Sequence, residues 1–297
     1  MPKSVSVPEK TLEHWSSQYL TYRYRSQAAL WWPSSREDID VRWLPTRPGK
    51  AVQLELKTTT VAGTGLHDVL VDLGQLWEYR QRPIGHQPFY AFPWPGWHGD
   101  LTTAAIAGGR PVTELGFGRS GPGWWFADWM VVLTAAQVER VLHKELAAHG
   151  CARRGTKKRL VRFDLTHSQL NPVVTWGSSA TPPQVVRWRN FWAELEQCGR
   201  AGWPQLIRLP ARFMQARGLY TSSRLAGLLQ EAAYMIAAGE WGDDDQLVTL
   251  APDADGNYQV APDPVLDLGE QHADSTDDVR DHRQVVFLEA GVLLRRR

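Results

Sequence analysis

The feature that most constrains this chain is the run AVQLELK at residues 51–57, in which apolar and polar side chains alternate. Successive side chains of a β-strand point to opposite faces, so Glu55 and Lys57 would share one face and Leu54 and Leu56 the other. The run therefore predicts a strand with an apolar underside and with an acid and an amine side by side above it.

The preceding segment, DIDVRW at residues 38–43, alternates in the same way, and prolines and a glycine between the two runs supply turn chemistry. If the two runs pair as a hairpin, the carboxylates of Asp40 and Glu55 meet on one face. Hard oxygen ligands of this kind bind Mg2+, which can activate water and neutralise charge on a phosphate. With Lys57 beside them, the two acids indicate phosphodiester hydrolysis; the alternative for this tripeptide alone is an ordinary solvated strand face.

The elements around these runs are also predictable. A capping-box pattern at residues 6–9 and helical spacing of Leu12, Trp15 and Tyr19 predict a first helix that carries Glu13. A second helical pattern, from about residue 66 to 82, places Gln75 and Tyr79 on one helix face because they are four positions apart. Strands are expected at 27–32 and 87–92, which gives the order helix, strand, strand, strand, helix, strand.

This order resembles the core of the PD-(D/E)XK nucleases. The series Glu13, Asp40, Glu55-x-Lys57 and Gln75-x-x-x-Tyr79 is similar to the motifs of their RecB-like branch, and the resemblance covers roughly residues 1–95. It implies an α/β fold with a restriction-endonuclease-like core, of order αβββαβ, in which helices flank a mixed central sheet.

The resemblance also implies roles for individual residues. Asp40, Glu55 and the Leu56 carbonyl would hold Mg2+ or Mn2+, with Glu13 assisting from the first helix. Lys57 would act on the attacking water. In the family, the pair that corresponds to Gln75 and Tyr79 helps to position that lysine and the nucleic acid.

Two features bear on how far the family pattern extends. Many RecB-like nucleases carry four cysteines for an iron–sulfur cluster, and this chain has only Cys151 and Cys198, so such a cluster cannot form. The aspartate expected to bind the metal ion lies in the tripeptide Asp38-Ile39-Asp40, and either aspartate of this tripeptide could be the ligand. The Ile-Asp-Val context of Asp40 resembles the family more closely, with Asp38 as its substitute.

The length of 297 residues allows two domains. We expect a nuclease-like domain at 1–150 and a C-terminal α+β domain at 151–297 that serves target recognition or assembly. Further elements are expected as a strand at 124–133, helices at 134–148, 183–197 and 223–238, and a final strand at 284–294. No run is long and apolar enough for a membrane span, and two distant cysteines suit a reducing compartment, so the expected location is the cytoplasm.

A net charge of +1 gives the chain no global field for nucleic acid, so local charge has to carry any binding. The basic run that contains Arg153, Arg154, Lys157 and Lys158 could bind the phosphates of a nucleic-acid backbone. The alternative interpretation of this run is a solvated linker between the two domains.

Aromatic side chains are a second candidate for binding nucleic acid. Trp31 and Trp32 precede the metal-binding runs and are candidates for stacking on bases. Trp188 and Trp192 recur at helical spacing and are expected to face the core instead.

The sequence thus predicts a Mg2+-dependent deoxyribonuclease that hydrolyses phosphodiester bonds of DNA in restriction, phage defence or repair. The alternative is a non-catalytic nucleic-acid-binding or assembly subunit that retains the nuclease fold. The joint presence of Glu13, Asp40, Glu55 and Lys57 favours the enzyme. Nucleic acid, most of all DNA, is the expected partner, and a second copy of the chain or a partner subunit is compatible with the pattern.

Overall fold

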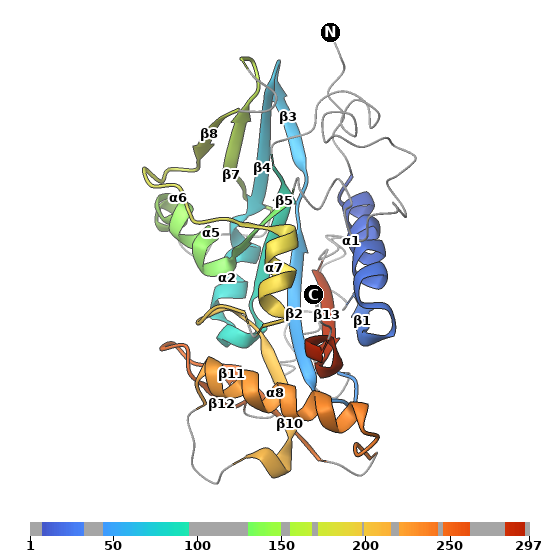
Figure 1. Cartoon of the computed structure of the whole chain (residues 1–297). Helices are drawn as coiled ribbons and strands as arrows, with labels where there is room; N and C mark the ends of the chain where they lie inside the picture. Colours follow the sequence, from blue (N-terminus) through green and yellow to red (C-terminus); the bar gives the residue numbers. More distant parts are fainter. Residues whose placement is uncertain are drawn as a thin grey trace, which may run out of the picture.

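The computed structural model describes residues 8–32, 44–94, 130–149, 155–167, 172–197, 199–214, 220–242, 246–261 and 283–294. Within them the protein is a mixed α/β structure with six α-helices, a curled central sheet of nine strands and a smaller sheet of four (Figure 1). The expected α/β class is confirmed at this level.

The elements are named in chain order. The first part contains α1 Glu9–Tyr24, β1 Ala28–Trp31, β2 Gly49–Leu56, β3 Thr59–Gly63, β4 Leu66–Asp72, α2 Leu73–Gln81, β5 Pro88–Pro93, β6 Met130–Thr134, α5 Ala135–Val141 and α6 His143–His149. The second part contains β7 Lys157–Asp164, β8 Val173–Trp176, β9 Val186–Arg187, α7 Trp188–Leu195, β10 Leu206–Pro210, α8 Ser222–Ala237, β11 Leu247–Pro252, β12 Tyr258–Val260 and β13 Arg283–Glu289. Short 3-10 turns lie at Arg25–Gln27, Ile84–His86, Ala211–Phe213 and Ala290–Leu294.

Strand β2 is the centre of the large sheet. One edge pairs antiparallel with β13 from Gly49 to Glu55, and the other pairs antiparallel with β10 and then parallel with β5 up to Leu56. Every residue of β2 is buried. Because a strand has only two edges, β2 has none left for the hairpin partner expected at 38–43; residues 33–43 themselves lie outside the described part of the chain.

Strands from both ends of the sequence build this sheet. Its order is β12-β11-β10-β2-β5-β6-β9, and β13 joins β2 to β1 on the other side. Strands β9 to β13 belong to residues 151–297, and β1, β2, β5 and β6 belong to residues 1–150. The two parts expected as separate domains therefore share one sheet.

Helices α1 and α7 cover one face of the central sheet. Leu54 and Leu56 of β2 belong to a buried cluster with Leu12 of α1 and with Trp188 and Trp192 of α7. Both tryptophans are fully buried, so their expected place in the core is confirmed and they cannot stack on bases.

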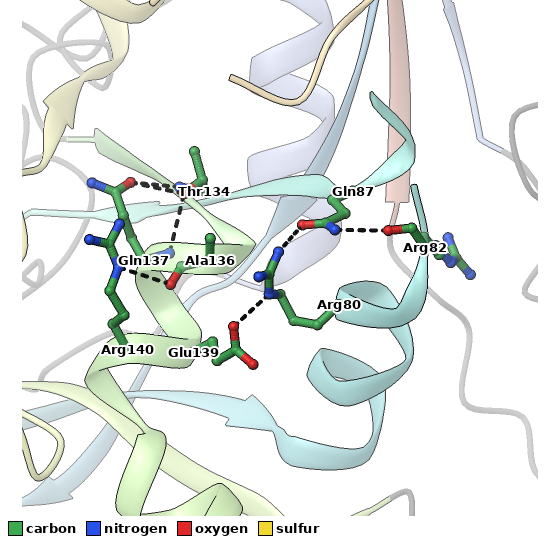
Figure 2. A network of polar contacts seen from close by, with 8 residues as sticks. All are labelled: Arg80, Arg82, Gln87, Thr134, Ala136, Gln137, Glu139 and Arg140. Carbon is green, nitrogen blue, oxygen red and sulfur yellow. Dashed lines mark hydrogen bonds and ion pairs between the residues drawn. The ribbon is translucent and has the colours of Figure 1, made fainter. Parts of the chain in front are cut away.

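Helices α2 and α5 cover the opposite face. Figure 2 shows how polar contacts fix the end of α2: Arg80 forms an ion pair with Glu139 of α5 at 2.7 Å and donates a hydrogen bond to Gln87. Gln87 in turn donates to the Arg82 carbonyl at 2.9 Å, immediately before β5. These contacts hold the last turn of α2 against the sheet.

The prediction of a helix at 66–82 is wrong for the first part of this range. Residues 66–72 form β4, which pairs with β3 and β7 and contributes Val69 and Val71 to a buried cluster. The apolar spacing in this stretch fits both periods, and the pairing with two strands decides between them. Asp72 then caps α2, because its Oδ1 accepts a hydrogen bond from the Gln75 backbone N–H at 3.1 Å.

The smaller sheet, of order β3-β4-β7-β8, projects beyond the end of β2 (Figure 1). Part of the basic run forms β7, where Arg162 makes two contacts of 2.7 Å with Asp68 of β4. The linker alternative is therefore wrong for residues 157–164. Residues 151–154 lie outside the described part of the chain.

The remaining elements agree with the sequence to different extents. The capping box at Thr134 is present, but the expected helix at 134–148 is divided into α5 and α6. The helix at 183–197 begins only at Trp188, the helix at 223–238 is confirmed as α8, and the final strand ends at Glu289. Of the strand at 124–133, only the part from Met130 is described. Among the described helices, none has the length and apolar character needed to cross a bilayer.

Candidate active site

Glu55 occupies the last part of β2, on the face opposite Leu54 and Leu56. Its side chain is 0 % exposed. Its neighbours Tyr79 and Tyr90 belong to the buried cluster between the sheet and helices α2 and α5. Glu55 therefore lies on the face of the sheet that these two helices cover. The alternation in the sequence thus predicts correctly which side chains of β2 share a face.

Two groups hold the Glu55 carboxylate. The Lys57 ammonium lies 2.6 Å from Oε1, and the Tyr79 hydroxyl donates a hydrogen bond to Oε2 at 2.9 Å. The Lys57 side chain is 12 % exposed, so the ion pair is largely removed from water. A buried carboxylate is tolerated when a cation and a hydrogen-bond donor compensate its charge, and both are present here.

The fold explains why these three groups meet. The Lys57 backbone N–H donates to the Ala91 carbonyl at 2.8 Å, which extends the parallel pairing of β2 with β5 past the end of β2. Helix α2 returns the chain to β5 and presents Tyr79 to the same face, with its ring 6.3 Å from the ring of Tyr90. Residues of two separate predicted motifs are thus in direct contact.

Gln75 lies one turn before Tyr79 on α2 and is also buried. Its backbone N–H is held by Asp72 at the start of the helix, as described above. The expected common helix face of Gln75 and Tyr79 therefore exists, although α2 is shorter than the sequence predicts.

Glu13 lies on α1 and approaches from the opposite face of the sheet. One turn later on α1, Ser16 donates to Gln284 Oε1 at 3.1 Å, and Gln284 donates to Ser17 Oγ at 2.8 Å. Gln284 pairs with Leu54 in the sheet. Leu12 of the same helix packs with Leu54 and Leu56, so α1 covers the face of β2 opposite the one that carries Glu55 (Figure 1).

A complete metal-binding set is not seen in the described part of the chain. No three or more His, Cys, Asp or Glu side chains come together there in a way that could hold an ion. Asp38 and Asp40, and likewise Cys151 and Cys198, lie outside these residues. The donors that are described, the carboxylates of Glu13 and Glu55 and the Leu56 carbonyl, have the hard oxygen chemistry that suits Mg2+.

The two tryptophans expected near the site differ in exposure. Trp31 pairs with Val285 of β13, which pairs with Gln53 of β2, and its partly buried ring packs against a core cluster. Trp32 is 49 % exposed and follows the end of β1. Of the two, Trp32 has the more accessible ring.

The basic residues expected to bind nucleic acid are described only in part. Lys157 is exposed and Lys158 is partly buried at the start of β7, where Lys157 pairs with Asp72. Arg153 and Arg154 lie outside the described residues.

Two buried polar residues and one half-buried arginine also lie at the site, and none of them is among the site residues predicted from the sequence. Gln53 and Arg283 are fully buried near Glu55, and Arg82 lies beside Tyr79, with 5.0 Å between its guanidinium carbon and the ring centroid. Gln53 shares the face of Glu55 by strand period, which was a usable signal. Nothing in the local sequence could indicate Arg283, because 230 positions separate it from Gln53.

Replacing Tyr79 with Phe tests the hydrogen bond to Glu55. The change leaves a buried carboxylate oxygen without its donor, so we expect the free energy of unfolding to fall by about 1.5–3 kcal/mol in urea titrations. In a Glu55→Gln background the acceptor is neutral, and the same replacement should cost about 1 kcal/mol less. Equal costs in the two backgrounds would contradict a direct bond.

Comparisons of this sequence and structure with known proteins found no similar protein. No family model matches the sequence, and no curated protein or solved structure is similar to it at a significant level.

Proposed function

We propose that this protein is a Mg2+-dependent nuclease that hydrolyses phosphodiester bonds of DNA in the cytoplasm, in restriction, phage defence or repair. The observation that carries the proposal is the contact of Glu55 with both Lys57 and Tyr79. An acid, an amine and a phenol from two motifs of the resemblance meet at one end of a buried strand. A solvated strand face, the alternative for the tripeptide, does not bury its acid.

The arrangement of elements supports a restriction-endonuclease-like core as part of this proposal. Strands β2 and β5 are parallel and α2 connects them, while α1 covers the other face. The hairpin β3–β4 is inserted between β2 and α2 and is an addition to the expected order. It forms half of the smaller sheet beyond the site, together with β7 and β8.

Each residue has a defined chemical role in the proposed reaction. Asp40, Glu55 and the Leu56 carbonyl would hold the ion, with Glu13 assisting from α1, and the bound ion would supply an activated water and charge neutralisation on the phosphate. Tyr79 fixes the orientation of the Glu55 carboxylate through Oε2. The Lys57 ammonium, released from Oε1, can orient the water and stabilise negative charge on the phosphate.

A non-catalytic nucleic-acid-binding or assembly subunit is the second candidate. The observation that favours it is that both oxygens of Glu55 already have partners within the protein. An ion pair of this kind can serve the fold alone. The two candidate functions differ in one property: in the nuclease, a metal ion displaces the Lys57 ammonium from Glu55 Oε1, and in the non-catalytic subunit it does not.

Cleavage assays distinguish the candidates. With Mg2+ or Mn2+ and a panel of labelled single- and double-stranded nucleic acids, we expect cleavage by the wild type and a loss of about a hundredfold or more in Glu55→Gln and Lys57→Met. Lys144→Ala, at an exposed position of α6, is the matched control and should retain activity. Equal cleavage by the two site variants, folded as judged by circular dichroism, would exclude the assigned roles.

Metal binding gives a second test. Because the Lys57 ammonium competes with a cation for Glu55 Oε1, Lys57→Met should bind Mn2+ about tenfold more tightly, which corresponds to about 1.4 kcal/mol. Glu55→Gln should bind it more weakly than the wild type. Calorimetric titration measures both, and an unchanged or weaker affinity of the lysine variant would contradict the competition.

The basic run is tested by the salt dependence of DNA binding. Replacing Arg153, Arg154, Lys157 and Lys158 with Ala in an inactive Glu55→Gln background should weaken binding. The slope of log K against log salt should fall by about 0.9 for each phosphate that the variant no longer neutralises. The matched control replaces two exposed residues, Arg140 and Lys144, and should leave the slope unchanged. Fluorescence anisotropy at several salt concentrations provides the data; an unaltered slope in the fourfold variant would remove these residues from the interface.

A further inference from the structure

A buried arginine lies next to the candidate active site and comes from the other end of the chain. Arg283 is the first residue of β13, and it pairs with Glu55 at the end of the antiparallel register. Both side chains are 0 % exposed. Residues directly opposite each other in an antiparallel pair project to the same face with Cβ atoms about 4.5–5.5 Å apart. The register thus places an arginine and a glutamate side by side, with both side chains removed from water.

The contacts of Arg283 lead to Tyr79, which binds Glu55, and to Gln53 on the same face of β2. Its guanidinium carbon lies 5.6 Å from the centre of the Tyr79 ring, within the range of a cation–π interaction. Its Nη1 lies 3.5 Å from Gln53 Oε1, and Gln53 donates to the His86 carbonyl at 3.0 Å. Arg283 therefore connects Tyr79 with the polar face of β2.

Several polar residues lie around Glu55 and its partner Tyr79. They come from the end of β2, from α2 and the residue after it, from β5 and from β13: Gln53, Lys57, Tyr79, Arg82, Tyr90 and Arg283. Glu55 is the carboxylate among them, and three of the others are cations. Since opposite charges on neighbouring buried residues interact strongly, we expect the charge of Arg283 to stabilise the Glu55 carboxylate.

We propose that Arg283 is a positioning residue of the candidate site, which holds Tyr79 and Glu55 in their relative orientation through its guanidinium group. This inference rests on the proposed nuclease function for its catalytic consequence. A cation near the face of a phenol ring draws electron density from the ring and makes the hydroxyl a better donor. Arg283 thereby strengthens the bond from Tyr79 to Glu55 Oε2, and it does so without reaching the substrate.

The first test is a double-mutant cycle that needs neither metal nor substrate. Wild type, Arg283→Met, Glu55→Gln and the double variant are unfolded in urea. Because the two charges interact, we expect Arg283→Met to change the unfolding equilibrium constant at least about fivefold less in the Glu55→Gln background. Additive effects would overturn the proposal.

Arg208 supplies the matched control. It is a second buried arginine, and its Nη1 donates to the carbonyls of Leu44 at 2.9 Å and Pro45 at 2.6 Å. It pairs with Gly49, at the other end of β2 and about 20 Å from Glu55 at about 3.3 Å per residue. Arg208→Met should add to Glu55→Gln within about twofold.

The second test separates positioning from general destabilisation. Under conditions where each variant is folded, Arg283→Met should lower kcat for DNA at least about tenfold and leave KM within about twofold, because the side chain does not contact substrate. Arg283→Lys keeps the charge and should restore part of kcat. A change confined to KM, or no change in kcat, would overturn the proposal.

The two tests remain informative if a variant or the proposed function fails. Should Arg283→Met not fold, Arg283→Gln, which also removes the charge, replaces it in the cycle. Arg283→Lys then replaces it in the kinetic test, with a loss of at least about threefold in kcat expected from the missing guanidinium. Should the wild type cleave no nucleic acid, the nuclease proposal fails, and the double-mutant cycle alone decides whether Arg283 is coupled to Glu55.

Discussion

The burial of one carboxylate governs this structure. Glu55 lies near the end of a strand whose residues are all buried, and it is tolerated there because Lys57 and Tyr79 bind it and Arg283 is its neighbour in the sheet. Removing a charge from water costs several kcal/mol, so the fold must keep these partners in place. The pairing of β2 with β5, the packing of α2 and the position of β13 each deliver one of them. The need to compensate this charge therefore links segments that are far apart in the sequence.

Much of the local structure was predictable from the sequence for physical reasons. The alternation around Glu55 indicated the correct faces of β2, because side-chain direction follows from strand geometry alone. The capping box at Thr134 and the helical period of α8 are likewise local signals, and both are confirmed. Of the candidate site, the sequence indicated Glu55, Lys57 and Tyr79 as residues, but not that the tyrosine hydroxyl binds the acid.

What the sequence could not provide is pairing between distant strands. Residues 66–72 fit a helical period, and only β3 and β7 on either side of β4 decide that they form a strand. The same holds for β13, which takes the edge of β2 that a neighbouring hairpin was expected to use. The sequence could not indicate Arg283 for the same reason, because its proposed role depends on the register of β13 with β2 and not on any local pattern.

The position of β13 also has a consequence for how the protein acquires its site during synthesis. Residues 49–56 leave the ribosome long before residues 283–289. The edge of β2 that pairs with β13 therefore has no β13 to pair with while most of the chain is still being synthesised. Contacts of such long sequence separation form late and slowly. A nascent chain therefore carries the acid and the lysine but lacks the strand that encloses them, and any hydrolytic capacity of this cluster would arise only near the completion of folding.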